Sequence, residues 1–389
     1  MEQEQLLKTF ERIFHKPAER VFFSPGRVNL IGEHTDYNGG HVFPCAITFG
    51  TYGLVARRDD HQIVCHSLNF EQDGLKGFST EAIQYEEADG WLNYIKGMVK
   101  YLQEEARQIV KGFDCLIYGN IPNGAGLSSS ASIELLVGVI VNQLADLQLD
   151  RVQLVKLGQK VENAFIGVNS GIMDQFAIGM GQEEQAIFLD VNTLEYELVP
   201  AEFGDYCLLI MNTNKRRELA DSKYNERRSQ CETALEKLQT ELTITSLGDL
   251  TEAEFEEYRF LINDEILEAR AKHAVYENIR TIKAREALCE NDLNTFAQLM
   301  NQSHDSLRDD YDVTGVELDT LVEAAREQDG VLAARMTGAG MGGCAIALVH
   351  KSKLKQVREA IAERYTSEIG YSPDFYVANV GAGTQEIPR

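Results

Sequence analysis

The sequence lacks the paired cysteines that mark small disulfide-rich or zinc-binding proteins. It has seven cysteines in 389 residues, and no two of them form a CxxC pair. An odd number of single cysteines argues against a disulfide framework and against a zinc site. We therefore expect most of these thiols to be small residues of the core, in a protein of the reducing cytoplasm.

Long apolar runs are also missing. The longest mainly apolar stretch, residues 133–144, contains Glu134 and Asn142 and is shorter than the roughly 20 residues of a membrane-spanning helix. Residues 1–8 are polar and acidic, unlike the basic start of a secretory signal. Apolar residues still make up 44% of the chain, which is enough for the cores of two domains. The sequence thus predicts a soluble protein without a membrane partner.

Positive charge is scarce, because 37 lysines and arginines stand against 61 aspartates and glutamates, for a formal net charge of -24. This balance argues against nucleic acid as a partner, since nucleic-acid binding depends on a basic surface. A nucleoside triphosphate is also an anion. A phosphate site in this chain therefore needs a local positive field from backbone N–H groups, a helix N-terminus, Mg²⁺ and a few cationic side chains.

The pattern of apolar residues changes along the chain. Strands and helices alternate in the first part, and they are predicted at residues 48–57, 63–67, 93–110, 113–121 and 152–165. After Asp190, charged helices dominate until a predicted strand at residues 344–349. We place the boundary between two domains near residue 185, which gives a first domain of residues 1–185 and a second of residues 186–389.

Residues 122–132 read PNGAGLSSSAS and lie between a predicted strand and a predicted long helix. Gly124 and Gly126 allow positive φ and a close approach of the backbone, so successive N–H groups can converge on phosphate oxygens. Three serines follow at the helix start, where backbone donors are free and the helix dipole favours anions. A glycine turn with a serine cap is the structural alternative, but capping requires only one serine. The segment predicts a phosphate site.

The same segment differs from the common nucleotide motifs. It has no GxxxxGK[ST] pattern and no lysine, so it is not a P-loop. It lacks the third glycine of a dinucleotide fingerprint, and the HRD and DFG sequences of protein kinases are absent from the chain.

A second polar segment, residues 24–40, reads SPGRVNLIGEHTDYNGG. It concentrates Arg27, Glu33, His34, Asp36 and Tyr37 between glycines. Fixed donors and acceptors of this kind suit a ligand with several hydroxyl groups. A solvated polar loop is an equally good interpretation of the composition alone.

Other candidate residues are weaker on their own. Residues 337–343, TGAGMGG, form a second glycine-rich turn ahead of an apolar strand. Glu162 lies on a predicted helix, and Asp174 follows a glycine break. A helical carboxylate is usually solvated, and an Asp after a glycine turn is usually an N-cap.

Together these segments resemble the GHMP small-molecule kinases, and residues 26–40 resemble the sugar-side signature of the branch that phosphorylates galactose. PNGAGLSSSAS is similar to the family's ATP loop and TGAGMGG to its third motif. The resemblance implies an α+β fold of two lobes. The first is a ribosomal-protein-S5-domain-2-like lobe with a mixed sheet, the second is ferredoxin-like, and the active site lies in the cleft between them.

The resemblance also implies roles for individual residues. Asp174 matches the aspartate that faces the C1 hydroxyl of the sugar, and Arg27 matches the arginine that keeps this carboxylate charged. The positions that match sugar contacts are Glu33, His34, Thr35, Asp36 and Tyr224. The positions that match nucleotide contacts are Ser67, Gly124, Ala125, Gly126, Leu127, Ser128, Ser129 and Ser130. Ser130 and Glu162 match the Mg²⁺ ligands.

The implied reaction is transfer of the γ-phosphoryl group of ATP to the C1 hydroxyl of α-D-galactose. It uses Mg²⁺ and yields galactose 1-phosphate and ADP, in a cytoplasmic enzyme that we expect to be a monomer. Two alternatives remain open at this point. One is a related kinase for N-acetylgalactosamine or arabinose, and the other is a sugar sensor that binds its ligand without turnover. The complete serine loop and Asp174 favour an enzyme over a sensor.

Overall fold

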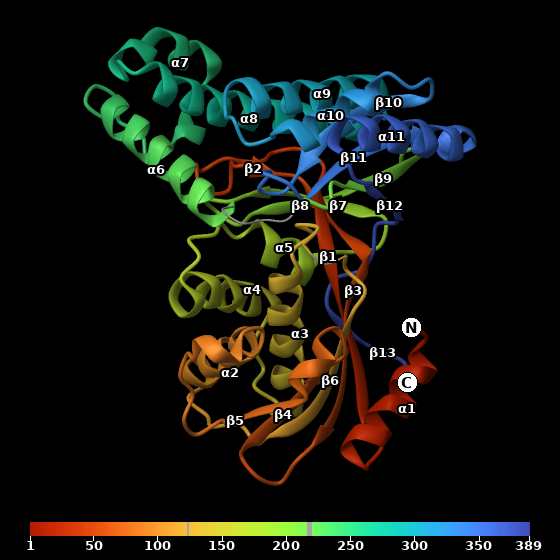
Figure 1. The fold of residues 1–389 in the computed structure, drawn as a ribbon. Helices are drawn as coiled ribbons and strands as arrows, with labels where there is room; N and C mark the ends of the chain where they lie inside the picture. The colour runs from red at the N-terminus through yellow and green to blue at the C-terminus, as the bar shows by residue number, and fades with distance from the viewer. Residues whose placement is uncertain (123, 216–219) are drawn as a thin grey trace.

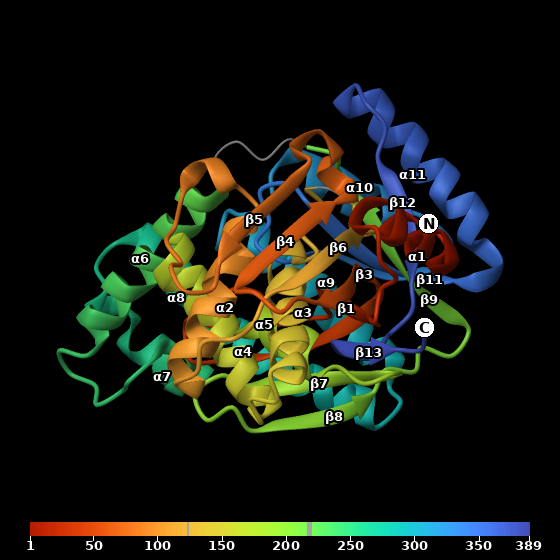
Figure 2. The same ribbon diagram turned by 90° about the horizontal axis from the view of Figure 1, so that it is seen from below.

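The computed structural model describes residues 1–389 except Asn123 and residues 216–219, so the predicted phosphate segment contains one residue outside the described part. Two lobes are stacked on one another, and both chain termini lie at the first lobe (Figure 1). The view from below shows the N-terminal helix and the C-terminal strand close together (Figure 2). Sheets and helices occur in both lobes, which confirms the predicted α+β class.

The first lobe is built on a six-stranded sheet in the order β13-β1-β3-β6-β4-β5. Its strands are β1 (Arg20–Asn29), β3 (Pro44–Arg57), β4 (Gln62–Ser67), β5 (Leu75–Ser79), β6 (Phe113–Gly119) and β13 (Gln385–Ile387). Strands β4 and β6 pair in parallel, whereas the other neighbours are antiparallel. The sheet is therefore mixed, as the resemblance predicts.

Helices cover both faces of this sheet because apolar side chains of the central strands point alternately to one face and to the other. Val55 and Cys115 face a core with α2 (Leu92–Ala106), α3 (Ser129–Leu144), α4 (Arg151–Lys160) and α5 (Met173–Met180). Leu54 and Leu116, one residue along, face α1 (Gln3–Phe14) on the other side. This period of two is what a sheet buried on both faces requires.

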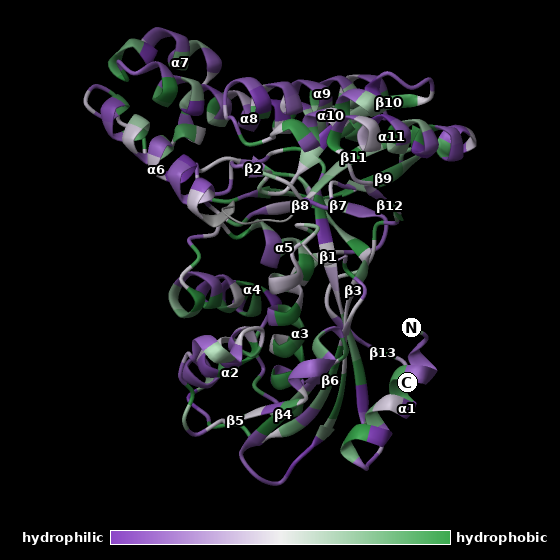
Figure 3. Cartoon of the chain, in the orientation of Figure 1, coloured by the Kyte–Doolittle hydropathy of each residue, from purple (hydrophilic) through white to green (hydrophobic). Residues whose placement is uncertain are grey.

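The second lobe has a four-stranded antiparallel sheet in the order β10-β11-β9-β12. Its strands are β9 (Tyr206–Asn212), β10 (Val331–Thr337), β11 (Cys344–His350) and β12 (Asp374–Ala378). The helices of this lobe are α6 (Ala220–Leu238), α7 (Glu252–Tyr258), α8 (Glu265–Cys289), α9 (Leu293–Asp309), α10 (Val316–Arg326) and α11 (Leu354–Ile369). Figure 3 shows α6 and α11 mainly hydrophilic, with hydrophobic residues gathered in the sheets and α3.

Two features join the lobes. A three-stranded sheet pairs β2 (His41–Val42) with β7 (Gln185–Asp190), which in turn pairs with β8 (Tyr196–Pro200). The last strand, β13, returns to pair with β1 of the first lobe. The chain thus passes between the lobes more than once, and the division at residue 185 stays a prediction.

Five of the seven cysteines are buried, Cys207 is partly buried, and Cys289 is exposed. The helix predicted for residues 152–165 ends at Lys160 and continues as a π-helical turn, Val161–Ile166. Among the described residues, no helix combines the length and the apolar character needed to cross a bilayer.

Candidate active site

Arg27 and Asp174 form a two-point ion pair in the cleft between the lobes. Arg27 Nε donates to Oδ1 of Asp174 at 2.8 Å, and Nη2 donates to Oδ2 at 3.0 Å. Arg27 is 4% exposed, whereas the Asp174 side chain is 33% exposed. Burial by itself lowers the pKa of Arg27, but the Asp174 carboxylate outweighs burial and raises that pKa above its ordinary value. The carboxylate therefore meets the cavity with a fixed positive charge behind it.

Local structure places both groups. Arg27 follows a shift in the β1–β3 register between Pro25 and Arg27, and such irregularities re-aim the side chains of a strand. Asp174 lies in the first turn of α5, where the helix dipole favours a carboxylate. Strand β1 and helix α5 are in contact, so residues 147 positions apart in sequence meet.

Residues 124–130, which we call the glycine–serine loop, wrap around this ion pair. Gly124 and Gly126 have φ of 69° and 70°, and Ser128 also has a positive φ of 62°. Ser128 Oγ donates to Oδ2 of Asp174 at 2.5 Å, and Arg27 Nη1 donates to the Gly126 carbonyl at 2.9 Å. The loop is thus tied to Asp174 from one side and to Arg27 from the other.

Helix α3 begins within this loop, at Ser129, so the last two residues of the loop form the start of the helix. The first N–H groups of a helix have no partner four residues earlier, and they carry the positive end of the dipole. Ser128 precedes the helix without a side-chain cap, because its hydroxyl is bound to Asp174. The start of α3 therefore offers backbone donors to an anion.

Two cavities meet at this helix start and share Tyr94 and Ser130. The first, of about 250 Å³, is lined by polar residues of both lobes, among them Arg27, Glu33, His34, Asp36, Glu162, Asp174 and Tyr224. The second, of about 320 Å³, is more apolar, and its lining includes Ser67, Phe70, Trp91, Ile117, Ser129 and Ile133. A polar pocket thus adjoins an apolar one at the end of α3.

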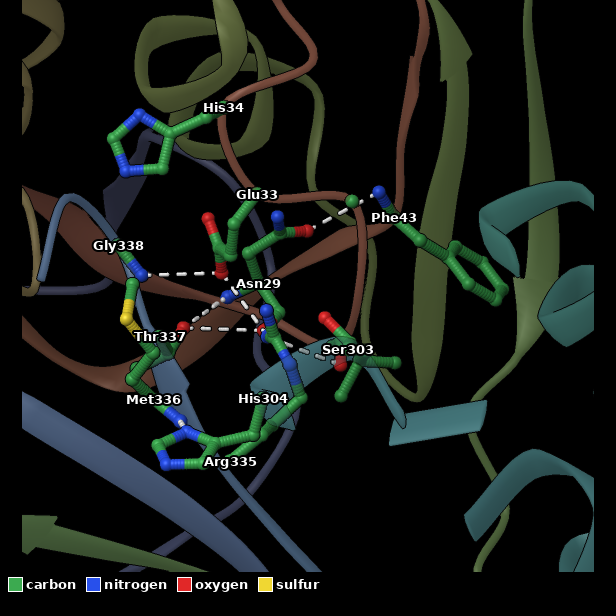
Figure 4. A network of polar contacts seen from close by, with 12 residues as sticks. Asn29, Glu33, His34, Phe43, Ser303, His304, Arg335, Met336, Thr337 and Gly338 are labelled. Atoms are coloured by element: carbon green, nitrogen blue, oxygen red, sulfur yellow. Dashed lines mark hydrogen bonds and ion pairs between the residues drawn. The ribbon is translucent and has the colours of Figure 1, made fainter. Parts of the chain in front are cut away.

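Residues 32–40, the EHTD loop, supply acceptors to the polar cavity. Glu33 is 1% exposed, and its Oε1 accepts from Arg335 Nη1 and from the Gly338 N–H, each at 3.1 Å (Figure 4). Burial raises the pKa of Glu33, while Arg335 and Arg27 act in the opposite direction. Burial and the nearby Asp174 charge raise the pKa of Asp36 to about 6.

The remaining sugar-side candidates lie around the same cavity. Thr35 Oγ1 lies 2.9 and 2.7 Å from the carbonyl oxygens of Gly32 and His41 and shares its one proton between them, so this side chain braces the loop itself. Tyr224 of α6 comes from the second lobe, with its ring centroid 5.6 Å from that of His34. The lobes together therefore enclose one polar pocket.

Comparison with known proteins agrees with this arrangement. Three family models match: a galactokinase galactose-binding signature at residues 8–57, a GHMP kinases N-terminal domain at 93–182 and a GHMP kinases C-terminal domain at 284–367. The chain is 57% identical over its full length to all of the galactokinase of Streptococcus suis. It is also 57% identical to that of Enterococcus faecalis, over 99% of this chain and 100% of that one.

The chain belongs to the galactokinase family of the GHMP kinases. The structure of Lactococcus lactis galactokinase complexed with galactose superposes with a TM-score of 0.97, at 52% identity and 99% coverage of each chain. A mevalonate kinase structure has a TM-score of 0.65 at 21% identity, over 92% of this chain and 98% of that one, and so shares the fold. The predicted family and fold are confirmed, whereas the roles of the site residues stay predictions.

Sequence reasoning missed the side chains that hold the EHTD loop from the second lobe of this galactokinase-family chain. Glu277 of α8 is 0% exposed and accepts from the Gly32 N–H at 3.0 Å, Ser303 Oγ at 2.5 Å and Arg280 Nε at 2.8 Å. Burial by itself would raise the pKa of Glu277, but neighbouring cationic groups, chiefly Arg280, outweigh it and lower the pKa to about 2. Asn278 Oδ1 accepts from the His41 N–H at 2.8 Å.

A signal for these residues exists, but it is ambiguous. The buried polar residues of α8 recur at helical spacing and are Arg270, His273, Glu277, Asn278 and Thr281. A polar stripe of this kind is also typical of a solvent-exposed helix face. Only the tertiary structure distinguishes the two.

Ser130 and Glu162 are the predicted metal ligands, and both line the polar cavity. Glu162 lies in the π-helical turn and is 7% exposed. Within the described part of the chain, no three His, Cys, Asp or Glu side chains are grouped to hold a metal by themselves. One carboxylate and one hydroxyl beside the predicted phosphate site suit Mg²⁺, which keeps several waters and phosphate oxygens as ligands.

Proposed function

We propose that the chain transfers the γ-phosphoryl group of ATP to the C1 hydroxyl of α-D-galactose, giving galactose 1-phosphate and ADP. The observation that carries the proposal is the Arg27–Asp174 pair where a polar cavity adjoins a helix N-terminus. Full-length relatives named galactokinase, and the likeness to a galactose complex, support the choice of sugar.

Asp174 is the proposed partner of the reacting hydroxyl. Its carboxylate can accept a hydrogen bond from the C1 hydroxyl, and the two hydrogen bonds from Arg27 hold it in position. The transition state of phosphoryl transfer is loose, so catalysis depends more on positioning and charge stabilisation than on a strong base. Orientation of the hydroxyl by Asp174, and stabilisation of the phosphoryl oxygens by Arg27, are therefore the proposed roles.

The sugar-side residues divide the recognition among them. Glu33 and Asp36 are acceptors for hydroxyl groups, and Tyr224 forms a wall of the pocket from the second lobe. His34 and Thr35 shape the same loop. Recognition of hydroxyl groups by buried acceptors discriminates strongly, because an analogue that lacks a hydroxyl leaves the acceptor unpaired.

The nucleotide is proposed to lie across the second cavity and the glycine–serine loop. The apolar lining near Ser67 suits the base, while residues 124–130 face the phosphates. Ser67 Oγ accepts from the Asn69 N–H at 3.3 Å and retains its own proton to donate. Ser130 and Glu162 would hold Mg²⁺, which neutralises phosphate charge during transfer. Without a lysine in the loop, backbone N–H groups and Arg27 supply the remaining positive field.

The proposed enzyme is a monomer of the cytoplasm. One chain lines both cavities, and all seven cysteines are free thiols, as a reducing compartment would leave them.

A panel of sugars with ATP and Mg²⁺, scored by ADP release, tests the reaction. We expect turnover with galactose and at least tenfold lower kcat/KM with N-acetylgalactosamine and arabinose. Faster turnover of N-acetylgalactosamine or arabinose than of galactose would indicate a related sugar kinase instead. Galactose binding, measured by calorimetry, without any ADP release would instead indicate a sugar sensor.

A further inference from the structure

Both ring nitrogens of His34 are already bound to protein atoms. Nε2 lies 3.0 Å from the carbonyl oxygen of Ala339, in the turn between β10 and β11. Nδ1 lies 2.7 Å from the hydroxyl oxygen of Tyr37, within the EHTD loop. His34 lines the polar cavity, but in this arrangement neither nitrogen is left for a sugar hydroxyl.

The chemistry of these partners fixes where the protons lie. A carbonyl oxygen can only accept, so Nε2 carries the ring proton and donates it to Ala339. Burial lowers the pKa of His34 to about 3, and a neutral ring has only one N–H. Nδ1 is therefore an acceptor, and Tyr37 donates its hydroxyl proton to it.

The chain of hydrogen bonds continues into the second lobe. Since Tyr37 has used its proton, its oxygen accepts from the hydroxyl of Tyr311 at 2.6 Å. The Tyr311 oxygen in turn lies 3.3 Å from Cys231 Sγ, and this thiol is the remaining donor. Tyr311 is fully buried just after α9, and Cys231 is buried in α6. Every donor in this chain has an acceptor, and only one direction satisfies all of them.

The same side chains are packed as rings as well as hydrogen-bonded. The His34 ring centroid lies 4.9 Å from that of Tyr311 and 5.6 Å from that of Tyr224. Tyr37 and Tyr224 lie 5.4 Å apart, edge to face. The hydrogen-bond chain thus passes directly behind the wall of the polar cavity.

We propose that Tyr37 and Tyr311 are positioning residues that hold His34 in its Nε2–H form. The His34 ring then fastens the EHTD loop to the turn at Ala339, and neither of its ring nitrogens binds the sugar. This inference rests on the proposed function, because its effect is on galactose binding. Tyr311 acts through Tyr37 and His34 and does not itself line the cavity.

Substitution of Tyr311 by Phe tests the proposal with little change in packing. The Tyr37 oxygen loses its donor, and we expect the KM for galactose to rise roughly tenfold, as for loss of a buried hydrogen bond. The kcat and the KM for ATP should stay within about twofold, because the glycine–serine loop is untouched. An unchanged galactose KM, or an equal loss in both KM values, would overturn the proposal.

Tyr365→Phe is the matched control. Tyr365 is also fully buried in the second lobe, and its hydroxyl makes a hydrogen bond of 2.7 Å to the Thr213 carbonyl. We expect its loss to lower stability as much as Tyr311→Phe does while leaving the galactose KM unchanged. If both variants raise this KM alike, the effect is a general loss of stability and the positioning role is wrong.

The tautomer can be read directly in the wild-type enzyme, independently of any variant. Long-range proton–nitrogen spectra with ¹⁵N-labelled histidine at pH 7 should show His34 protonated at Nε2 alone, with His34→Gln used for assignment. In Tyr37→Phe the same signal should shift toward a mixture of the two tautomers. A proton on Nδ1 in the wild type would refute the inference. Failure of the wild type to phosphorylate galactose would refute the proposed function instead.

Discussion

The two loops that meet at Asp174 are held in opposite ways. The EHTD loop is fixed by side chains from the second lobe, because Glu277 binds the backbone N–H groups of Gly32 and Glu33, and Arg335 binds the Glu33 carboxylate. The glycine–serine loop runs through positive-φ residues, and its side-chain contacts to Arg27 and Asp174 belong to the site itself.

This difference agrees with the ligand proposed for each loop, sugar for the EHTD loop and phosphate for the glycine–serine loop. A sugar presents several hydroxyl groups at fixed angles, so its acceptors must be placed in advance by a rigid surround. Phosphate oxygens are alike and charged, so a cluster of backbone N–H groups is sufficient to bind them. A loop that binds through its N–H groups has to leave those groups without partners in the free protein.

Removal of the carboxylate where the loops meet should have the largest effect. We expect Asp174→Ala to lower kcat by about 10³-fold, because it removes the proposed acceptor for the reacting hydroxyl and the carboxylate that pairs with Arg27. Nucleotide binding, measured by calorimetry with a non-hydrolysable ATP analogue, should stay within a few-fold of wild type. Near-normal turnover would show that Asp174 has no catalytic role.

Glu277→Gln tests the EHTD loop, which side chains of the second lobe hold in place. The substitution leaves Arg280 without its charge partner and weakens the anchor of Gly32, whereas Arg335 keeps its ion pair with Glu33. We expect a loss of about 3 kcal/mol in the free energy of unfolding by urea. Glu286→Gln, at an exposed position on the same helix, should change this free energy by less than about 0.5 kcal/mol.

Acid should reproduce part of the Glu277→Gln effect. The folded-state pKa of Glu277 is about 2, below its ordinary value of 4.5, so its ionised form stabilises the fold above about pH 4.5. That stabilisation is lost as the pH falls from 4.5 toward 2. The variant should therefore lose less stability than the wild type between pH 5 and pH 3. Parallel losses in the two proteins would show that this carboxylate is not the titrating group.

Ser130→Ala tests the glycine–serine loop, at one of the two residues that both cavities share. Loss of one oxygen ligand should raise the Mg²⁺ concentration for half-maximal activity by roughly tenfold, with the KM for galactose unchanged. Ser129→Ala is the control, since Ser129 lines only the second cavity. Equal metal dependence in both variants would leave Ser130 without a metal role.

Much of the fold and the proposed chemistry could be predicted because it is local in sequence. Residues 26–40 and 122–132 carry their residue types in continuous segments, and they identified the family and fold that the comparisons confirm. Several strands of the second lobe were harder. Strands β9 and β10 were not predicted, although β11, which pairs with both of them, was.

The supports of the EHTD loop could not be predicted, because each acts over more than 200 positions of sequence. Gly32 meets Glu277 at a separation of 245 residues, and Glu33 meets Arg335 at a separation of 302. The spacing of residues within a short segment of sequence does not indicate such a contact. Arg335 is moreover a fully buried cation in a strand, a place where charge is rare unless it is paired.

The smallest expected effect concerns the backbone of the glycine–serine loop. Gly124 has φ of +69°, and a Cβ there would meet no atom within 4 Å, so Gly124→Ala adds no clash. Its cost is the left-handed conformation itself, about 1 kcal/mol. Gly204 has a similar φ of +56° and equally open space, and it lines neither cavity, so Gly204→Ala is the control. Both variants should lose similar stability, but only Gly124→Ala should raise the KM for ATP, by a few-fold. A rise in neither variant would mean that phosphate binding does not depend on the conformation of Gly124, and the loop would then bind through the start of α3 alone.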